Sequence, residues 1–160
     1  MCLTGDLSFQ GRNRRPPRDP VNAMLSFGYT LLFYNIYAIV RSRGLSPYVG
    51  SLHALRQGHP ALCSDLIEEF RAPIVDSLVT SLVNKRVVTA ADFYTSDGCY
   101  LTDQARRGFV SHFEKKMNTL LVHPGAGLRT TWRGCIDIQV GHYIQALRGE
   151  ADAYTPIEPR

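Results

Sequence analysis

The sequence predicts a mainly α protein built as a single helical-bundle domain. Apolar residues recur at helical spacing over long stretches, helix-capping pairs such as Asp19-Pro20 precede them, and strand-like segments are short. A chain of 160 residues that is 44% hydrophobic can bury one core of ordinary domain size. We expect a basic, extended entry segment over 1–18, a helical domain over 19–149 and a flexible tail over 150–160.

The first predicted helix is long and has an uncharged centre. Asp19 is an N-cap, Pro20 occupies the first helical position, and the apolar pattern runs to Gly44. Its stretch AMLSFGYTLLFYNIYAIV, residues 23–40, approaches the length of a bilayer span. Polar residues are scattered all round this stretch, which suits the centre of a bundle better than lipid. We therefore predict a buried helix and no membrane partner.

Two further helices are predicted between residues 47 and 84. Ser46 followed by Pro47 repeats the cap-then-proline signal and predicts a short helix, PYVGSLHAL, that carries His53. From Ala61 to about Asn84 the apolar spacing is helical again, and Pro73 should kink that helix. The residues expected to face its core are Leu62, Leu66, Phe70 and Ile74.

The second half of the chain predicts shorter elements and then two helices. Thr89 with Asp92 three residues on starts a short helix, residues 96–98 form a turn, and CYL beyond it pairs briefly as a strand. Thr102 caps a helix that ends with Leu120 and Leu121. The last helix spans roughly residues 130–147.

Composition limits the class of protein only mildly. The formal net charge is +4 and the pI is about 9.0, which slightly favours an anionic partner such as nucleic acid. The four cysteines lie far apart and form no CxxC pair, so neither a zinc ribbon nor a disulfide framework is indicated. No secretory signal opens the chain, and we expect a cytoplasmic protein.

One histidine precedes an acidic helix in VGSLHALRQGHPALCSDLIEEFR. Asp65 and Glu68 are three residues apart, so they occupy adjoining parts of one helix face, away from or beside the core side. With His53 delivered from the preceding helix, they form a mixed N/O set suited to Mg²⁺ or Mn²⁺. A solvated acidic helix face produces the same pattern, and periodicity alone leaves both interpretations open.

The arginines allow two interpretations as well. Arg12, Arg14 and Arg15 stand beside two prolines in the entry segment, where they can contact DNA phosphates or simply form a solvated linker. Arg56 and Arg71 add positive charge near the proposed metal site. This distribution tips the balance slightly toward nucleic-acid binding.

Three separated blocks resemble one known family. GRNRRPPRDPVNAMLSFGY, GLSPYVGSLH and SDLIEEFRAPIVD resemble, in order and spacing, the C-terminal helical domain of the CRISPR-associated integrase, and similarity extends over about residues 9–155. That enzyme is the endonuclease that inserts new spacers into CRISPR arrays. The residues of the segment SDLIEEFRAPIVDSLV most resemble those of family members that are fused to a reverse transcriptase.

The resemblance implies a metal-dependent chemistry and a set of partners. His53 matches the family's histidine ligand, Glu68 its later acidic ligand, and Asp65 a second acidic position that supports metal or substrate. The family uses Mg²⁺ or Mn²⁺ for a phosphodiester transesterification on double-stranded DNA, the prespacer and the CRISPR repeat. Full-length members work as a homodimer bridged to a small ferredoxin-like partner protein.

One part of the family's pattern has no match here. The family's first glutamate lies on a helix before the GRNRRPP block, and its β-rich N-terminal domain is missing, so the chain resembles a C-terminal piece. With His53, Asp65 and Glu68 alone, a Mg²⁺ ion has few protein ligands. We therefore expect weak metal binding and little strand transfer by this chain alone.

Two rival interpretations remain beside the integrase. A catalytically silent DNA-binding or assembly module of the same fold would carry the same blocks without doing chemistry. An unrelated helical protein with no site would share only generic amphipathic patterning, which seldom yields three separate blocks in the correct order.

Overall fold

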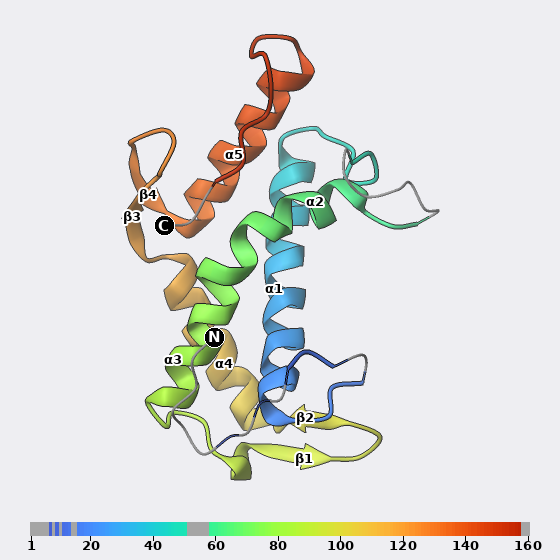
Figure 1. The fold of residues 1–160 in the computed structure, drawn as a ribbon, viewed down its shortest axis with the longest axis vertical. Coiled ribbons are helices and arrows are strands. Elements are labelled where there is room, and N and C mark those ends of the chain that lie inside the picture. The colour runs from blue at the N-terminus through green and yellow to red at the C-terminus, as the bar shows by residue number, and fades with distance from the viewer. Residues whose placement is uncertain (1–6, 8, 10, 14–15, 51–57, 158–160) are drawn as a thin grey trace. The chain divides into compact units, whose positions relative to one another are not determined.

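The computed structural model describes residues 7, 9, 11–13, 16–50 and 58–157. Helices dominate these residues and only two short hairpins interrupt them, which confirms the mainly α prediction (Figure 1). The elements are α1 (Pro20–Ser42), α2 (Ala61–Phe70), the π-helical turn η1 (Arg71–Asp76), α3 (Ser77–Asn84), the 3₁₀ turn η2 (Ala90–Asp92), β1 (Phe93–Thr95), β2 (Cys99–Leu101), α4 (Asp103–Met117), β3 (Leu120–Val122), β4 (Arg129–Thr131) and α5 (Trp132–Leu147).

The chain divides into two compact units, each made from two separate stretches. The first unit combines the residues up to Thr30 with Ala72–Lys116, and the second combines Leu31–Arg71 with the residues from Met117 onward. The predicted single domain over 19–149, with its entry segment and tail, stays a prediction.

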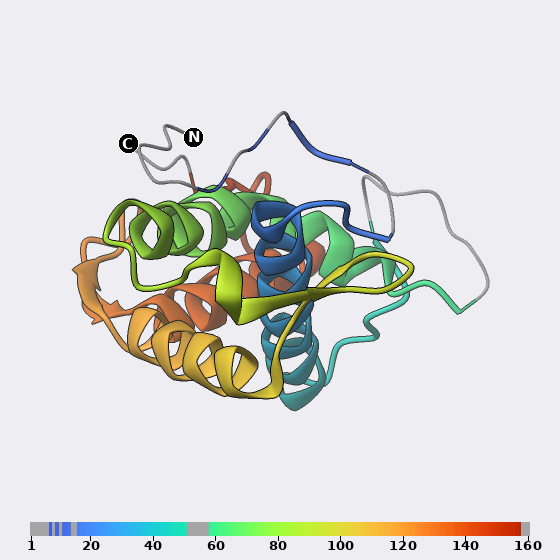
Figure 2. The same ribbon diagram turned by 90° about the horizontal axis from the view of Figure 1, so that it is seen from below.

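Close helix packing forms the core of the first unit. The rings of Phe27 on α1 and Phe109 on α4 have centroids 5.6 Å apart. A Cβ atom added at Gly28 would lie 2.6 Å from a methyl carbon of Val75 and 3.2 Å from Phe109, so the backbone of α1 approaches both side chains closely. Figure 2 shows α3 and α4 beside the start of α1, with the β1–β2 hairpin crossing that end.

The start of α1 matches its predicted cap. The Asp19 carboxylate accepts a hydrogen bond from the backbone N–H of Asn22 (2.8 Å), and proline occupies the first helical position. The Asn22 side chain is fully buried and donates to Asp19 (2.7 Å) and to the carbonyl of Gly11 (3.0 Å). This network attaches the described part of the entry segment to the helix.

By length and composition alone, helix α1 is long and apolar enough to cross a membrane, as its sequence indicates. Its fully buried residues include Met24, Leu32, Ile36 and Val40, which recur at intervals of four or eight along one side. Side chains buried in this pattern belong to a core helix, which supports the predicted buried helix.

The helix predicted over 61–84 is interrupted at Pro73, as expected. Proline has no N–H to donate to the carbonyl four residues back, and the backbone widens there into the π-helical turn η1. The hydroxyl of Ser77 donates to the carbonyl of Pro73 at 2.6 Å. The boundary between the two units falls inside this turn, between Arg71 and Ala72.

The predicted helix PYVGSLHAL is wrong in its described part. Pro47 and Tyr48 form a turn, and Val49 and Gly50 have no regular structure. The carbonyl of Pro47 accepts from the backbone N–H of Leu62 (3.0 Å), so this segment bonds to the start of α2 instead of to its own next turn. Residues 51–57, which include His53, lie outside the described residues.

The second half of the chain confirms most of the predicted elements and corrects one. The turn over 96–98 joins β1 to β2, the capping box at Thr89 and Asp92 is present, and Thr131 caps α5. Leu120 and Leu121 do not end a helix. They form strand β3, because the turn after His123 returns the chain and lets their backbone pair with Thr130 and Thr131.

The described part of the tail after Glu150 packs within the second unit. Ile157 is only 7% exposed, and its backbone N–H donates to Glu69 at 2.8 Å. Tyr154 packs edge-on against Tyr143 of α5, with ring centroids 5.6 Å apart. Apolar burial and a carboxylate acceptor therefore fix the described end of the chain within the second unit.

Candidate functional site

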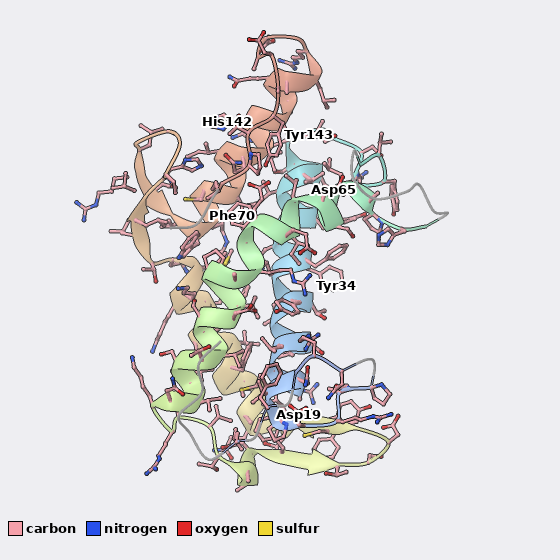
Figure 3. All side chains as sticks on the ribbon, in the orientation of Figure 1. Asp19, Tyr34, Asp65, Phe70, His142 and Tyr143 are labelled. Carbon is pink, nitrogen blue, oxygen red and sulfur yellow. The ribbon has the colours of Figure 1, made fainter. Side chains whose placement is uncertain are left out.

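Helix α2 of the second unit carries three carboxylates in its last two turns. Asp65 and Glu69 are half-buried, whereas the Glu68 side chain is 54% exposed. Asp65 and Glu68 are three residues apart, which places them on adjoining parts of the helix surface. The carboxylates of the predicted pair thus share one side of α2, and Figure 3 labels Asp65 there.

Glu68 forms an ion pair with Arg71. Arg71 donates to its carboxylate at 2.7 Å, three residues along the chain, and both side chains are substantially exposed. Exposed pairs of this kind contribute roughly 0–1 kcal/mol. A cation could therefore recruit Glu68 at little cost in stability.

Asp65 lies against the segment that leads toward His53. A Cβ atom added at Gly50 would lie 2.6 Å from a carboxylate oxygen of Asp65, and 2.7 Å from the backbone carbon of Ala61. Only glycine allows this close approach. The described chain therefore reaches the Asp65 side of α2 just before residues 51–57.

The described residues fit one part of a metal site. Carboxylate oxygens are the ligands that Mg²⁺ and Mn²⁺ prefer, and Asp65 and Glu68 supply them from one helix surface. Among the described residues, no group of three or more His, Cys, Asp or Glu could hold a metal ion. The third predicted ligand, His53, lies outside the described residues.

Glu69 is the carboxylate that sequence reasoning missed. It accepts hydrogen bonds from the Tyr154 hydroxyl, from Gln139 Nε2 (2.9 Å) and from the backbone N–H of Ile157 (2.8 Å). Burial, and then Glu69, raise the pKa of Tyr154, so its hydroxyl stays a donor. A signal was available: Glu69 lies three residues after Leu66 on the apolar side of α2, where an acid needs fixed partners.

The cysteine of α2 does not join this site. Cys63 is fully buried, and burial raises its pKa to about 11. It is therefore a thiol near neutral pH, and a thiol is neither a strong nucleophile nor a metal ligand.

The predicted DNA-contacting arginines have different surroundings. Arg12 donates to Asn22 Oδ1 at 2.7 Å, and its guanidinium carbon lies 5.4 Å from the ring centroid of Tyr29, although the side chain is exposed. Arg71 pairs with Glu68. Arg14, Arg15 and Arg56 lie outside the described residues.

One histidine, in the loop after strand β3, is buried. His123 is 1% exposed, and its Nδ1 accepts from the backbone N–H groups of Gly125 (3.2 Å) and Ala126 (3.0 Å). Its Nε2 has no hydrogen-bond partner. Desolvation, and then the neighbouring His142, lower the pKa of His123, so the neutral ring is favoured.

A separate cavity of about 650 Å³ lies in the first unit. Tyr94 and Tyr100 line it with ring centroids 5.7 Å apart, and Arg106, which pairs with Asp103 at 2.5 Å, lines it as well. None of the candidate metal ligands that the structure describes lines this cavity.

Comparison with known proteins places these features in a family context. The model of the family described as CRISPR associated protein Cas1 matches residues 1–115. The chain is 41% identical over 159 residues to the CRISPR-associated endonuclease Cas1 3 of Thermus thermophilus. The aligned region covers 99% of this chain and 48% of that protein. It thus spans about half the length of this relative.

Solved structures share the fold. A casposase bound to integration product superposes with a TM-score of 0.83 at 27% identity, covering 96% of this chain and 47% of that one. A chain of a Cas6-RT-Cas1–Cas2 complex superposes with a TM-score of 0.79 at 25% identity, covering 94% of this chain and 16% of that one.

Proposed function

The chain belongs to the Cas1 family of CRISPR-associated proteins, and from this premise we propose that it is the metal-site and DNA-contacting part of an integrase that inserts spacer DNA into CRISPR arrays. The observation that carries the proposal is the pair Asp65 and Glu68 on one side of α2, next to the Gly50 segment that leads to His53.

We propose that His53, Asp65 and Glu68 bind Mg²⁺ or Mn²⁺. When bound, the cation supplies charge stabilisation at a DNA phosphate. Glu68 leaves its ion pair with Arg71 to bind the cation, and Arg71 is one of the proposed phosphate contacts. Asp65 is held close to α2 by the approach of Gly50, so its carboxylate is oriented before a ligand arrives.

In the proposed reaction a DNA 3′ hydroxyl attacks a phosphodiester of the target strand. A new phosphodiester forms, the target strand's own 3′ oxygen leaves with a proton, and no covalent bond to the protein is made. Arg12, Arg14, Arg15, Arg56 and Arg71 are the proposed phosphate contacts, through charge-assisted hydrogen bonds. The proposed partners are double-stranded DNA, a second copy, a small ferredoxin-like protein and a reverse transcriptase.

The ligand count limits the proposed activity of this chain by itself. Mg²⁺ prefers six oxygen ligands in nearly octahedral order, and two carboxylates with one histidine leave about half of them to water. We therefore expect weak metal binding and slow strand transfer by the 160-residue chain.

A strand-transfer assay tests the proposal. Labelled DNA with a free 3′ hydroxyl is incubated with Mn²⁺, a repeat-containing duplex and the chain, the His53→Ala variant or the Glu68→Ala variant. Slow joining or nicking that both substitutions abolish supports the proposal. Activity that both variants retain contradicts it.

The second candidate, a silent DNA-binding or assembly module, is favoured by the fixed position of Arg12 over Tyr29. In that case Glu68→Ala leaves every measurable activity unchanged. Replacing Arg12, Arg14 and Arg15 by alanine still weakens DNA binding. It also lowers the steepness of the plot of log binding constant against log salt concentration, by up to about one for each lost phosphate contact.

A further inference from the structure

Glu69 connects three parts of the second unit. One carboxylate oxygen accepts from the Tyr154 hydroxyl, and the other accepts from Gln139 Nε2 and from the backbone N–H of Ile157. Gln139 belongs to α5, and Tyr154 and Ile157 belong to the segment after it. The last turn of α2 is therefore tied to α5 and to the end of the described chain through one side chain.

These partners are themselves fixed. The Gln139 side chain is 1% exposed, and its Nε2 also approaches the Tyr154 hydroxyl (3.0 Å) and the carbonyl of Thr155 (3.1 Å). Its other amide atom, Oε1, lies 3.1 Å from Nδ1 of His142. Figure 3 labels His142 and Tyr143, neighbours in sequence on α5. A buried network of this kind holds its members in one arrangement because each polar group depends on the others.

Helix geometry links Glu69 to the proposed metal ligands. Asp65 and Glu69 are four residues apart and share one face of α2, and Glu68 is the next residue. Rotation of the last turn about the helix axis would redirect all three carboxylates together. The regular helix ends at Phe70, directly after these carboxylates, and the π-helical turn η1 follows.

We propose that Glu69 is a positioning residue, which fixes the rotation of α2 through Tyr154, Gln139 and Ile157 and thereby directs Asp65 and Glu68 toward a divalent cation. This inference rests on the proposed metal site. Glu69 binds no metal itself, because both of its oxygens are occupied by protein donors.

A Mn²⁺ titration followed by electron paramagnetic resonance tests this role. Glu69→Gln keeps one acceptor oxygen and replaces the other with an NH₂ group, so at least one donor loses its acceptor. Tyr154→Phe removes only one donor. Glu114→Gln is the matched control on the exposed surface of α4. All proteins are measured well below their melting temperatures.

The expected result is a Mn²⁺ dissociation constant about tenfold higher in Glu69→Gln, since outer groups that orient ligands typically account for 10–100-fold in affinity. Tyr154→Phe should give a smaller loss, about threefold, and Glu114→Gln none. If Glu69→Gln does not fold, Tyr154→Phe carries the test.

Two outcomes overturn the inference and are distinguishable. A saturable Mn²⁺ site in the unsubstituted chain that both variants leave unchanged overturns the positioning role alone. An unsubstituted chain that binds Mn²⁺ no better than Glu68→Gln overturns the proposed metal site, and the positioning role with it.

Discussion

The start of α1 and the end of α2 both present carboxylates, but they use them differently. At the start of α1, Asp19 accepts from the backbone of Asn22 and from the side chains of Asn22 and Asn13, at 2.7–2.9 Å. At the end of α2, Glu68 has one exposed ion pair with Arg71. A carboxylate saturated by fixed donors stabilises the fold, whereas one held by a weak surface pair remains available to a ligand.

The same contrast appears between neighbours on α2 itself. Glu69 is saturated in the way Asp19 is, and Glu68 is not. Residue type therefore does not identify a site by itself. What separates the two roles is the number of fixed donors around each carboxylate.

The largest expected effect comes from Glu68→Gln. It should weaken Mn²⁺ binding by about 100-fold or more, because loss of a direct ligand should exceed the 10–100-fold typical of outer groups. The free energy of unfolding should change by less than about 0.5 kcal/mol, as for other surface substitutions. Isothermal titration and urea unfolding measure the two quantities, with Glu114→Gln as control. A large loss of stability in Glu68→Gln would contradict the conclusion that Glu68 contributes little to the stability of the fold.

Asp19→Ala should show the opposite profile. It removes an N-cap, which costs about 1 kcal/mol, and leaves one of the two N–H groups of the buried Asn22 amide without its acceptor, which costs about 1–3 kcal/mol. We expect a total loss of about 2–3 kcal/mol in urea unfolding and no change in Mn²⁺ affinity. The exposed Asp97 provides the control, and Asp97→Ala should lose less than about 1 kcal/mol. Equal losses of unfolding free energy in Asp19→Ala and Asp97→Ala would contradict the stabilising role of Asp19.

Gly50→Ala should affect the candidate site through sterics. Its new Cβ would meet Asp65 and the backbone at the start of α2, at distances under 3 Å that the structure must relieve. We expect a destabilisation of about 1–3 kcal/mol and a Mn²⁺ affinity lowered by about tenfold. Gly108→Ala is the control, because its Cβ would meet nothing within 4 Å. An unchanged Mn²⁺ affinity in Gly50→Ala would show that the segment around Gly50 does not influence the metal site.

The smallest expected effect concerns the buried His123. Its folded pKa lies below the unfolded value of about 6.5, so the neutral form stabilises the fold. That contribution is complete above pH 6.5 and is lost as the pH falls below 6.5 toward the folded pKa, with a slope of at most about 1.4 kcal/mol per pH unit. His123→Asn keeps an acceptor near Nδ1 and removes the titration. Unfolding free energies between pH 7 and 5 should therefore decline less in the variant, and equal slopes would count against this role.

Local signals predicted the regular elements well. The cap at Asp19, the interruption at Pro73 and the spacing of Leu62, Leu66 and Phe70 depend on neighbours within a few residues, and the structure confirms all of them. The helix predicted from Pro47 failed because its carbonyl bonds to Leu62, a partner fifteen residues away.

The site was predictable only in part for the same reason. The spacing of Asp65 and Glu68 is local and could be read from the sequence. The partners of Glu69 lie 70–88 residues away in the chain, so no local pattern predicts them. The contacts of the described tail could not be predicted either, because its polar composition does not reveal that Tyr154 and the backbone of Ile157 donate hydrogen bonds to Glu69.

The most direct test of the central claim is an anomalous-diffraction map of the 160-residue chain crystallised with Mn²⁺. We predict one strong peak bound by carboxylate oxygens of Asp65 and Glu68 and by a ring nitrogen of His53, at about 2.0–2.3 Å, with Arg71 released from Glu68. A peak at other residues, or Glu68 still paired with Arg71 in crystals saturated with Mn²⁺, would contradict the account.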